Sequence, residues 1–186
     1  MRLGVLVSGR GSNLEAVLRA GFAIAIVIGN RPGVRAFEVA AGHGVRIVAL
    51  RRADFADAEA RDAAIGAALT DARVELALLA GYDQLLRPSY FAAFAGRTIN
   101  IHPSLLPAHG GAGMMGLAVH QSVLDARELE TGVTIHEVSP DLDAGPILAQ
   151  ARVPVLAGDD AAALASRVLV EEHRLLVATL SELARS

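Results

Sequence analysis

The sequence contains no cysteine and no lysine. Without cysteine, the chain forms no disulfide, offers no thiolate nucleophile and has no thiolate ligand for zinc. Its 17 basic residues are all arginine, so the chain lacks the amine for a Schiff base and the lysine of a nucleotide-binding P-loop. These absences exclude enzyme classes that depend on a thiolate or on a lysine amine.

Long apolar runs and a strong net charge are also missing. No run approaches the roughly 20 residues of a membrane-spanning helix, and the first residues do not follow the order of a secretory signal. The net charge is −3 and 53% of the residues are hydrophobic, which favours a globular protein without a broad basic surface for nucleic acid. We therefore expect a cytoplasmic protein that forms one domain over residues 1–186.

Apolar, strand-like runs alternate with helix-like stretches along the chain. The expected strands are 3–7, 22–28, 45–50, 76–80, 98–102, 131–138 and 147–153, and the expected helices are 14–18, 32–42, 57–70, 117–124 and 159–183, with another beginning at Pro88. This alternation is typical of an α/β fold with a Rossmann-like, doubly wound, mostly parallel sheet and helices on both faces. The short turn before the last strand indicates some antiparallel pairing near the C-terminus.

The end of the fifth expected strand holds the strongest candidates for chemistry. Side chains alternate along a strand, so Asn100 and His102 share one face, and Pro103 ends the strand. The amide of Asn100 can donate a hydrogen bond to an oxyanion. The imidazole of His102 can exchange a proton near neutral pH. The pair therefore predicts catalysis at the carboxyl end of this strand.

A carboxylate near His102 would favour the charged form of the imidazole. Asp141 and Asp143, in a later turn, are both candidates, and either can instead serve only as an Asx-turn residue. Metal binding by His102 with one of these carboxylates is the rival interpretation. The local spacing offers no third ligand, so a metal site is not expected. Ser104 lacks the glycine-flanked elbow of a nucleophile and is interpreted as a helper or turn residue.

A glycine-rich turn, residues 8–13, follows the first expected strand. Ser12 or Asn13 is suited to cap the next helix, and free N–H groups at such a turn suit a phosphate. Leu14 stands where a dinucleotide fingerprint has its third glycine, and no acidic residue follows the second strand. The turn is therefore equally consistent with a pocket for a phosphate monoester and with a tight turn that has no ligand.

Residues 8–14, 100–107 and 141–146 resemble the folate-dependent formyltransferase family. Shorter matches at 153–155 and 171–173 extend the resemblance over nearly the whole chain. The resemblance implies transfer of the formyl group of the cosubstrate 10-formyltetrahydrofolate to the amine of glycinamide ribonucleotide, a step of de novo purine biosynthesis. It also implies that the reaction needs no metal.

The same resemblance implies roles for individual residues. The catalytic residues would be Asn100, His102 and Asp143, with Asp143 keeping His102 charged. The residues that bind the ribonucleotide would be Gly11, Ser12, Asn13 and Glu172. The folate would contact Gln84, Leu85, Leu86, Asn100, Ser139, Pro140, Asp141, Leu142 and Asp143. The N-terminal half would thus bind phosphate and the C-terminal half folate.

Several alternatives remain open. Methionyl-tRNA formyltransferase, a sugar-nucleotide formyltransferase and formyltetrahydrofolate hydrolase share the central motif, although the first carries an added C-terminal domain and the last an added N-terminal domain. A non-catalytic folate- or phosphate-binding module is a different class, and the presence of all three catalytic candidates disfavours it. We expect small-molecule partners only, with no nucleic acid and no membrane, and a monomer or homodimer.

Overall fold

The computed structural model describes residues 1–185, and its contacts divide the chain into two compact units. Unit 1 comprises residues 1–99, and unit 2 begins at Asn100. The expectation of one domain over the whole chain stays a prediction. None of the helices in the described residues is long and apolar enough to cross a membrane.

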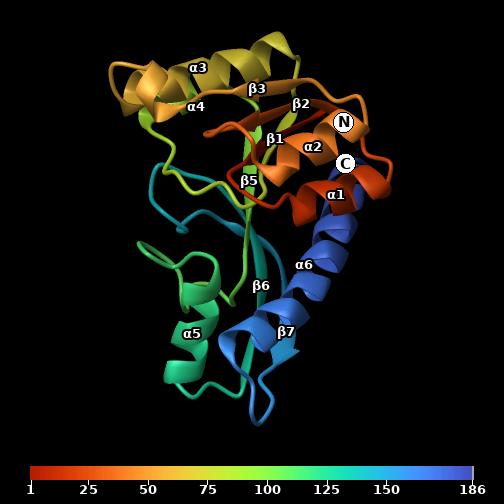
Figure 1. The fold of residues 1–186 in the computed structure, drawn as a ribbon, viewed down its shortest axis with the longest axis vertical. Coiled ribbons are helices and arrows are strands. Elements are labelled where there is room, and N and C mark those ends of the chain that lie inside the picture. The colour runs from red at the N-terminus through yellow and green to blue at the C-terminus, as the bar shows by residue number, and fades with distance from the viewer. Residues whose placement is uncertain (186) are drawn as a thin grey trace. The chain divides into compact units, whose positions relative to one another are not determined.

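Unit 1 alternates strands and helices. Its elements are β1 (Leu3–Val7), α1 (Ser12–Arg19), β2 (Ile24–Gly29), α2 (Arg35–Gly42), β3 (Ile47–Ala49), the 3-10 helix η1 (Arg52–Asp54), α3 (Ala58–Asp71), β4 (Leu76–Leu79) and α4 (Pro88–Ala93). The strand pairs β3–β2, β2–β1 and β1–β4 are all parallel. Helices α1 and α2 lie on one side of these strands, and α3 and α4 on the other (Figure 1).

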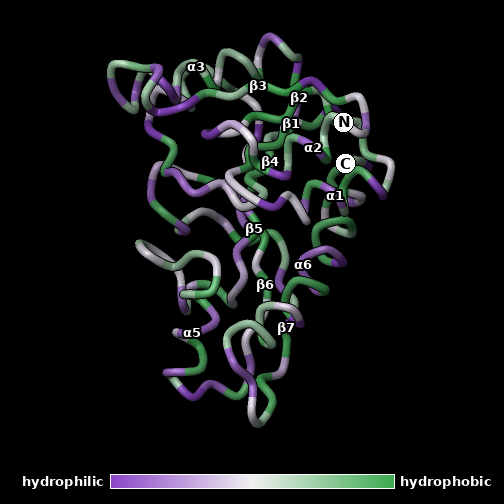
Figure 2. The backbone as a smooth tube through the Cα atoms, in the orientation of Figure 1, coloured by the Kyte–Doolittle hydropathy of each residue, from purple (hydrophilic) through white to green (hydrophobic). Residues whose placement is uncertain are grey.

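The central strands of unit 1 are apolar because both of their faces are covered. Every residue of β1 and of β4 is buried, and Figure 2 shows β1 as a hydrophobic stretch. A strand covered by helices on both faces has no polar side, so its sequence is a continuous apolar run. Gly4 leaves room for α3, because a Cβ there would lie 2.4 Å from Cδ2 of Leu69.

The start of α1 differs from the prediction. Neither Ser12 nor Asn13 caps this helix: Gly11 is the N-cap, and no side chain supplies a capping hydrogen bond. Gly11 has a φ of 76°, and a Cβ on it would lie 2.7 Å from Cα of Ala36 in α2. Both constraints require glycine. Ser12 and Asn13 therefore form the first turn of the helix, one step later than a capping residue.

Unit 2 contains the end of β5 (Arg97–His102), followed by four further elements. These are α5 (Leu117–Asp125), β6 (Glu130–Glu137), β7 (Ile147–Pro154) and α6 (Ala161–Leu183). Strands β6 and β7 are antiparallel, in a register that pairs Glu130 with Pro154 and Ile135 with Ala149. Helix α6 packs on both of these strands. The predicted antiparallel pairing near the C-terminus is confirmed.

The strand order of the sheet is β3-β2-β1-β4-β5-β6-β7. The winding reverses between β1 and β4, because β2 and β3 extend from one edge of β1 and β4 pairs with the other. In doubly wound sheets, ligands bind outside the carboxyl ends of the strands at such a reversal. The predicted α/β class, with a mostly parallel sheet, is confirmed. The ends of most elements lie within a few residues of their predicted positions, where helix and strand boundaries are least sharply defined.

Replacing Asp160 with alanine is expected to lower the free energy of unfolding by ~1 kcal/mol. The carboxylate of Asp160 accepts a hydrogen bond of 2.7 Å from N of Ala163 and caps the longest helix, α6. Asp160→Asn is the matched control, because asparagine keeps the capping oxygen. Denaturant unfolding of the two variants would measure the difference, and equal losses would show that the cap contributes nothing.

Candidate active site

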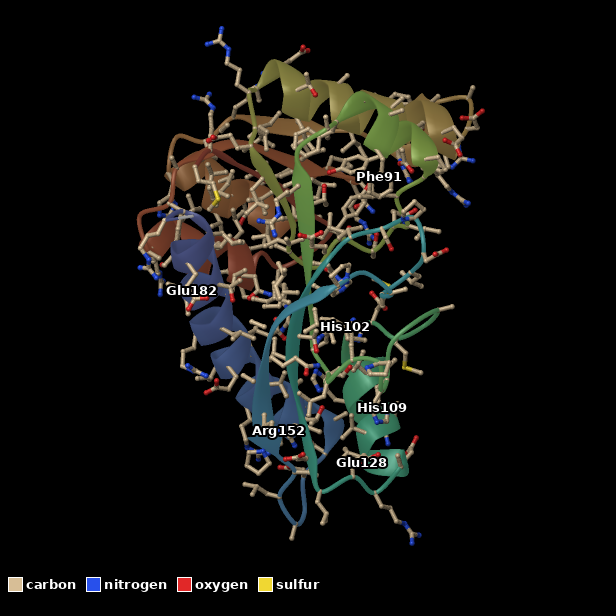
Figure 3. All side chains as sticks on the ribbon, turned by 180° about the vertical axis from the view of Figure 1, so that it is seen from behind. Phe91, His102, His109, Glu128, Arg152 and Glu182 are labelled. Atoms are coloured by element: carbon tan, nitrogen blue, oxygen red, sulfur yellow. The ribbon has the colours of Figure 1, made fainter. Side chains whose placement is uncertain are left out.

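The strand β5 carries Asn100 and His102 to its carboxyl end, and Figure 3 marks His102 there. Ile99 and Ile101 are buried and alternate with the two polar residues along the strand. The strand ends at His102, directly before Pro103. The predicted arrangement of an amide and an imidazole at this strand end is therefore present.

The ring of His102 is held by one strong contact. Its Nε2 lies 2.9 Å from the backbone oxygen of His109. A carbonyl oxygen only accepts hydrogen bonds, so the proton resides on Nε2. His102 Nδ1 is then the nitrogen left to exchange a proton, and it lies 3.8 Å from Oδ2 of Asp143. That distance is too long for a hydrogen bond, but it sets the Asp143 carboxylate beside this nitrogen.

Asp143 reaches this position from the turn between β6 and β7. Its backbone is left-handed, with a φ of 53°, and its Oδ2 accepts a hydrogen bond of 2.9 Å from N of Gly111. The turn is closed by a hydrogen bond of 2.9 Å from N of Glu137 to O of Pro146. Gly145 permits this closure, because a Cβ there would lie 1.8 Å from O of Glu137. Of the two carboxylates left open by the sequence, Asp143 approaches His102.

His136 is a member of the site that sequence reasoning missed. It lies on β6, is 2% exposed, and its Nε2 is 3.1 Å from Nδ2 of Asn100 and 3.6 Å from Oδ1 of Asp143. Burial lowers its pKa, although the carbonyl of Glu137 and the charge of Asp143 oppose the shift. The sequence offered one signal for this residue: side chains alternate along β6, so His136 lies on the same face as the polar Thr134.

The segment after β5 is fixed by a buried polar network. Thr134 Oγ1 donates to O of Ser104 (2.7 Å), and accepts from N of Leu106 (3.0 Å) and from Nε2 of Gln150 (2.9 Å). Ser104 Oγ donates to O of Ala108 at 2.6 Å. Ser104 therefore serves here as a turn residue. The network holds the chain that carries the His109 carbonyl to His102.

Two further histidines lie close to His102. His109 is in the glycine-dense loop before α5 (Figure 3), and its Nδ1 is 2.8 Å from Oγ of Ser122. His120, on α5, is buried, and both its burial and the charge of His102 lower its pKa. Both effects favour the neutral form of His120. The described residues contain no group of three His, Asp or Glu side chains placed to hold a metal ion.

The glycine-rich turn of unit 1 lies at the carboxyl end of β1, beside the reversal between β1 and β4. Oγ of Ser8 donates to Oδ1 of Asp83 at 3.0 Å, and Asn30 and Arg31 also donate to this carboxylate. Burial alone would raise the pKa of Asp83, but hydrogen bonds from Gln84, Asn30 and Ser8 keep it below its usual value. One charged carboxylate thus joins the ends of β1, β2 and β4 around the turn.

The other residues predicted to bind substrates are distributed over both units. In unit 1, Gln84 accepts a hydrogen bond of 3.2 Å from Nη1 of Arg61, Leu85 is exposed and Leu86 is buried. In unit 2, Ser139 donates to O of Asp141 at 3.0 Å within the turn that also holds Pro140 and the exposed Leu142. Glu172 lies half-buried on α6. Gly11, Ser12 and Asn13 begin α1 in unit 1.

Comparison with known proteins agrees with this fold. A family model described as formyl transferase matches residues 1–180. Phosphoribosylglycinamide formyltransferase of Mycobacterium tuberculosis is 41% identical over 187 residues, which cover 98% of this chain and 85% of the relative. A trifunctional purine biosynthetic protein of Drosophila pseudoobscura pseudoobscura is 39% identical over 98% of this chain, which spans only 14% of that protein's length.

Solved structures give the same result. The crystal structure of phosphoribosylglycinamide formyltransferase from Brucella melitensis has a TM-score of 0.88 and 42% identity, over 100% of this chain and 96% of that one. The enzyme from Streptococcus pneumoniae TIGR4 has a TM-score of 0.91 and 30% identity, with 98% of each chain covered.

The chain belongs to the formyl transferase family, as the sequence resemblance predicted. Within that family, the relatives that it covers nearly end to end are phosphoribosylglycinamide formyltransferases.

Proposed function

We propose that the protein transfers the formyl group of 10-formyltetrahydrofolate to the amine of glycinamide ribonucleotide, in de novo purine biosynthesis. The observation that carries this proposal is the convergence of the Asn100 amide, Nδ1 of His102 and the Asp143 carboxylate at the end of β5. The names and the near-complete coverage of its relatives support the choice of substrates.

Asn100 and His102 are suited to the charge that develops in formyl transfer. The amine nitrogen bonds to the formyl carbon, and the carbonyl oxygen becomes an oxyanion in the tetrahedral intermediate. An N–H of Asn100 and a protonated Nδ1 of His102 donate to that oxyanion, and a donor so placed typically lowers the barrier by about 3 kcal/mol. The Asp143 carboxylate, 3.8 Å from Nδ1, stabilises the charged ring.

The reaction then needs one proton moved from nitrogen to nitrogen. The attacking amine loses a proton, the bond between the formyl carbon and the folate nitrogen breaks, and that nitrogen gains a proton. His102 Nδ1 gives a proton to the folate nitrogen, and Asp143, directly or through water, receives the proton that the amine loses. Transfer of that proton from Asp143 to His102 then restores both groups. The products are the formylated amine and tetrahydrofolate, with no net change in protons and no covalent enzyme intermediate.

The substrates themselves would be held by the remaining predicted residues. The first turn of α1, from Gly11 to Asn13, has backbone N–H groups that suit a phosphate. Glu172 would bind the ribose or glycinamide end of the ribonucleotide. Gln84, Leu85 and Leu86 would line the folate pocket, and the turn from Ser139 to Asp143 would close over the pteridine. We further propose a cytoplasmic protein, monomeric or homodimeric, with small-molecule partners only.

An absorbance assay of folate deformylation tests this function against its alternatives. We expect turnover that requires glycinamide ribonucleotide. Turnover with water alone would favour a formyltetrahydrofolate hydrolase, and turnover only with a sugar nucleotide or methionyl-tRNA would favour the corresponding transferase. No turnover with any of these acceptors would favour a non-catalytic binding module.

Ser12→Asp is expected to raise the Michaelis constant for glycinamide ribonucleotide about tenfold, which corresponds to ~1.4 kcal/mol. The reason is repulsion between the added carboxylate and the phosphate at the start of α1. Steady-state kinetics at low salt would measure the change, with Ser12→Ala as the uncharged control. An unchanged Michaelis constant for Ser12→Asp would show that the phosphate binds to another part of the chain.

A further inference from the structure

The two ring nitrogens of His136 have different neighbours. Nδ1 lies 2.9 Å from the backbone oxygen of Glu137. Because a carbonyl oxygen accepts and never donates, the proton of the ring is on Nδ1. Nε2, at 3.1 Å from Nδ2 of Asn100, then carries a lone pair in the neutral ring. His136 is therefore a hydrogen-bond acceptor toward Asn100.

An acceptor at this position selects one of the two orientations of the Asn100 amide. With the NH₂ group toward His136, one N–H donates to Nε2 and the second N–H remains for another partner. With the amide rotated by 180°, its oxygen would face the Nε2 lone pair at about the same distance. Two acceptors in contact repel each other, so the neutral ring disfavours the rotated form.

We propose that His136 is a positioning residue, whose Nε2 orients the Asn100 amide so that an N–H donor, rather than the amide oxygen, faces the formyl oxygen. The proposal rests on the function proposed above. The rotated amide would set an oxygen against the developing oxyanion and would raise the barrier to attack. His136 thus acts on the reaction through Asn100.

When His136 is neutral, the negative charge of Asp143 has His102 as its only charged histidine partner among these two rings. Oδ1 of Asp143 is 3.6 Å from Nε2 of His136, and Oδ2 is 3.8 Å from Nδ1 of His102. A charged His136 would donate from Nε2 to Asp143 and would repel a proton on His102. Its burial, which lowers its pKa, and the positive charge of His102 both act against that form.

Two variants, each with an amide side chain at position 136, distinguish the roles of the two ring nitrogens. In His136→Asn, the shorter amide reaches the position of Nδ1 and keeps the contact with Glu137, but loses the acceptor toward Asn100. In His136→Gln, the longer amide reaches the position of Nε2 and restores that acceptor. We expect kcat for formyl transfer to fall about tenfold or more in His136→Asn and to stay within about threefold of wild type in His136→Gln.

A double-mutant cycle tests whether the effect passes through Asn100. In an Asn100→Ala background, His136→Asn is expected to lower kcat by no more than about twofold further, because no amide is left to orient. Additive losses would assign His136 a separate or merely structural role and would overturn the proposal. So would a His136→Asn enzyme that turns over as fast as wild type.

Nitrogen NMR of the unsubstituted protein tests the same idea without any variant. We expect the ¹⁵N shifts of His136 to report a neutral ring with its proton on Nδ1 at pH 7. A proton on Nε2, or a charged ring, would overturn the proposal even if the variants failed to fold. Wild-type enzyme without formyl transfer to glycinamide ribonucleotide would instead refute the proposed function, while this NMR result could still hold.

Discussion

His102→Ala and Asp143→Asn are each expected to lower kcat about 10²-fold or more, while the midpoint of thermal unfolding stays close to that of wild type. In the proposed mechanism, alanine removes the nitrogen, His102 Nδ1, that would donate to the oxyanion and move the proton. Asparagine at position 143 removes only the charge proposed to stabilise the ring, because its amide oxygen can still accept from N of Gly111. Single-turnover and steady-state kinetics would measure the losses.

Matched controls separate these effects from general damage. His43→Ala removes an exposed histidine after α2 in unit 1, and Asp125→Asn neutralises a carboxylate at the end of α5. Both controls are expected to keep kcat within about twofold of wild type. Near-normal turnover in His102→Ala or Asp143→Asn would remove that residue from the catalytic machinery, whichever substrates the enzyme uses.

Asp62→Ala is expected to lower the free energy of unfolding by about 3–5 kcal/mol, because it leaves a buried guanidinium without its counter-ion. The side chains of Arg61 and Asp62 are 2% and 0% exposed, and Asp62 Oδ1 is 2.7 Å from Nε and 2.6 Å from Nη2 of Arg61. The second oxygen, Oδ2, accepts from N of Arg87 at 2.8 Å. The variant therefore removes both a charge partner and the link from α3 to the start of α4.

Denaturant unfolding with two further variants would test this reason for the loss. Asp71→Ala, at the exposed end of the same helix, is expected to change the free energy by no more than about 0.5 kcal/mol. The double variant Arg61→Met, Asp62→Leu is expected to recover most of the stability, because it removes both charges at once. A loss below about 1 kcal/mol for Asp62→Ala would show that water reaches the guanidinium.

Local geometry accounts for what the sequence predicted correctly. Strand alternation is a property of the backbone, so Asn100 and His102 could be set on one face of β5 without knowledge of the rest of the fold. The antiparallel pairing of β6 and β7 followed in the same way from the short turn between them. Both predictions depend on residues that are neighbours in the sequence.

Contacts between distant segments account for what the sequence did not predict. His136 lies 36 residues beyond Asn100 and reaches it from another strand, so its pattern within β6 could not reveal its partner. The choice between Asp141 and Asp143 required the conformation of a turn that Gly145 closes against Glu137. The N-cap of α1 is Gly11 because Ala36 of α2 packs closely against it. This contact between distant segments could not be predicted from the sequence of α1.

The left-handed backbone of Asp143 limits how the site can vary over evolution. Glycine, asparagine, aspartate and histidine occupy this conformation more readily than other residues do, and of these only aspartate is acidic. Few substitutions at position 143 would therefore keep the conformation of the turn, and none of them would keep an acidic side chain there. Gradual drift through glutamate would strain the main chain, so loss of the carboxylate is expected to be abrupt and hard to reverse.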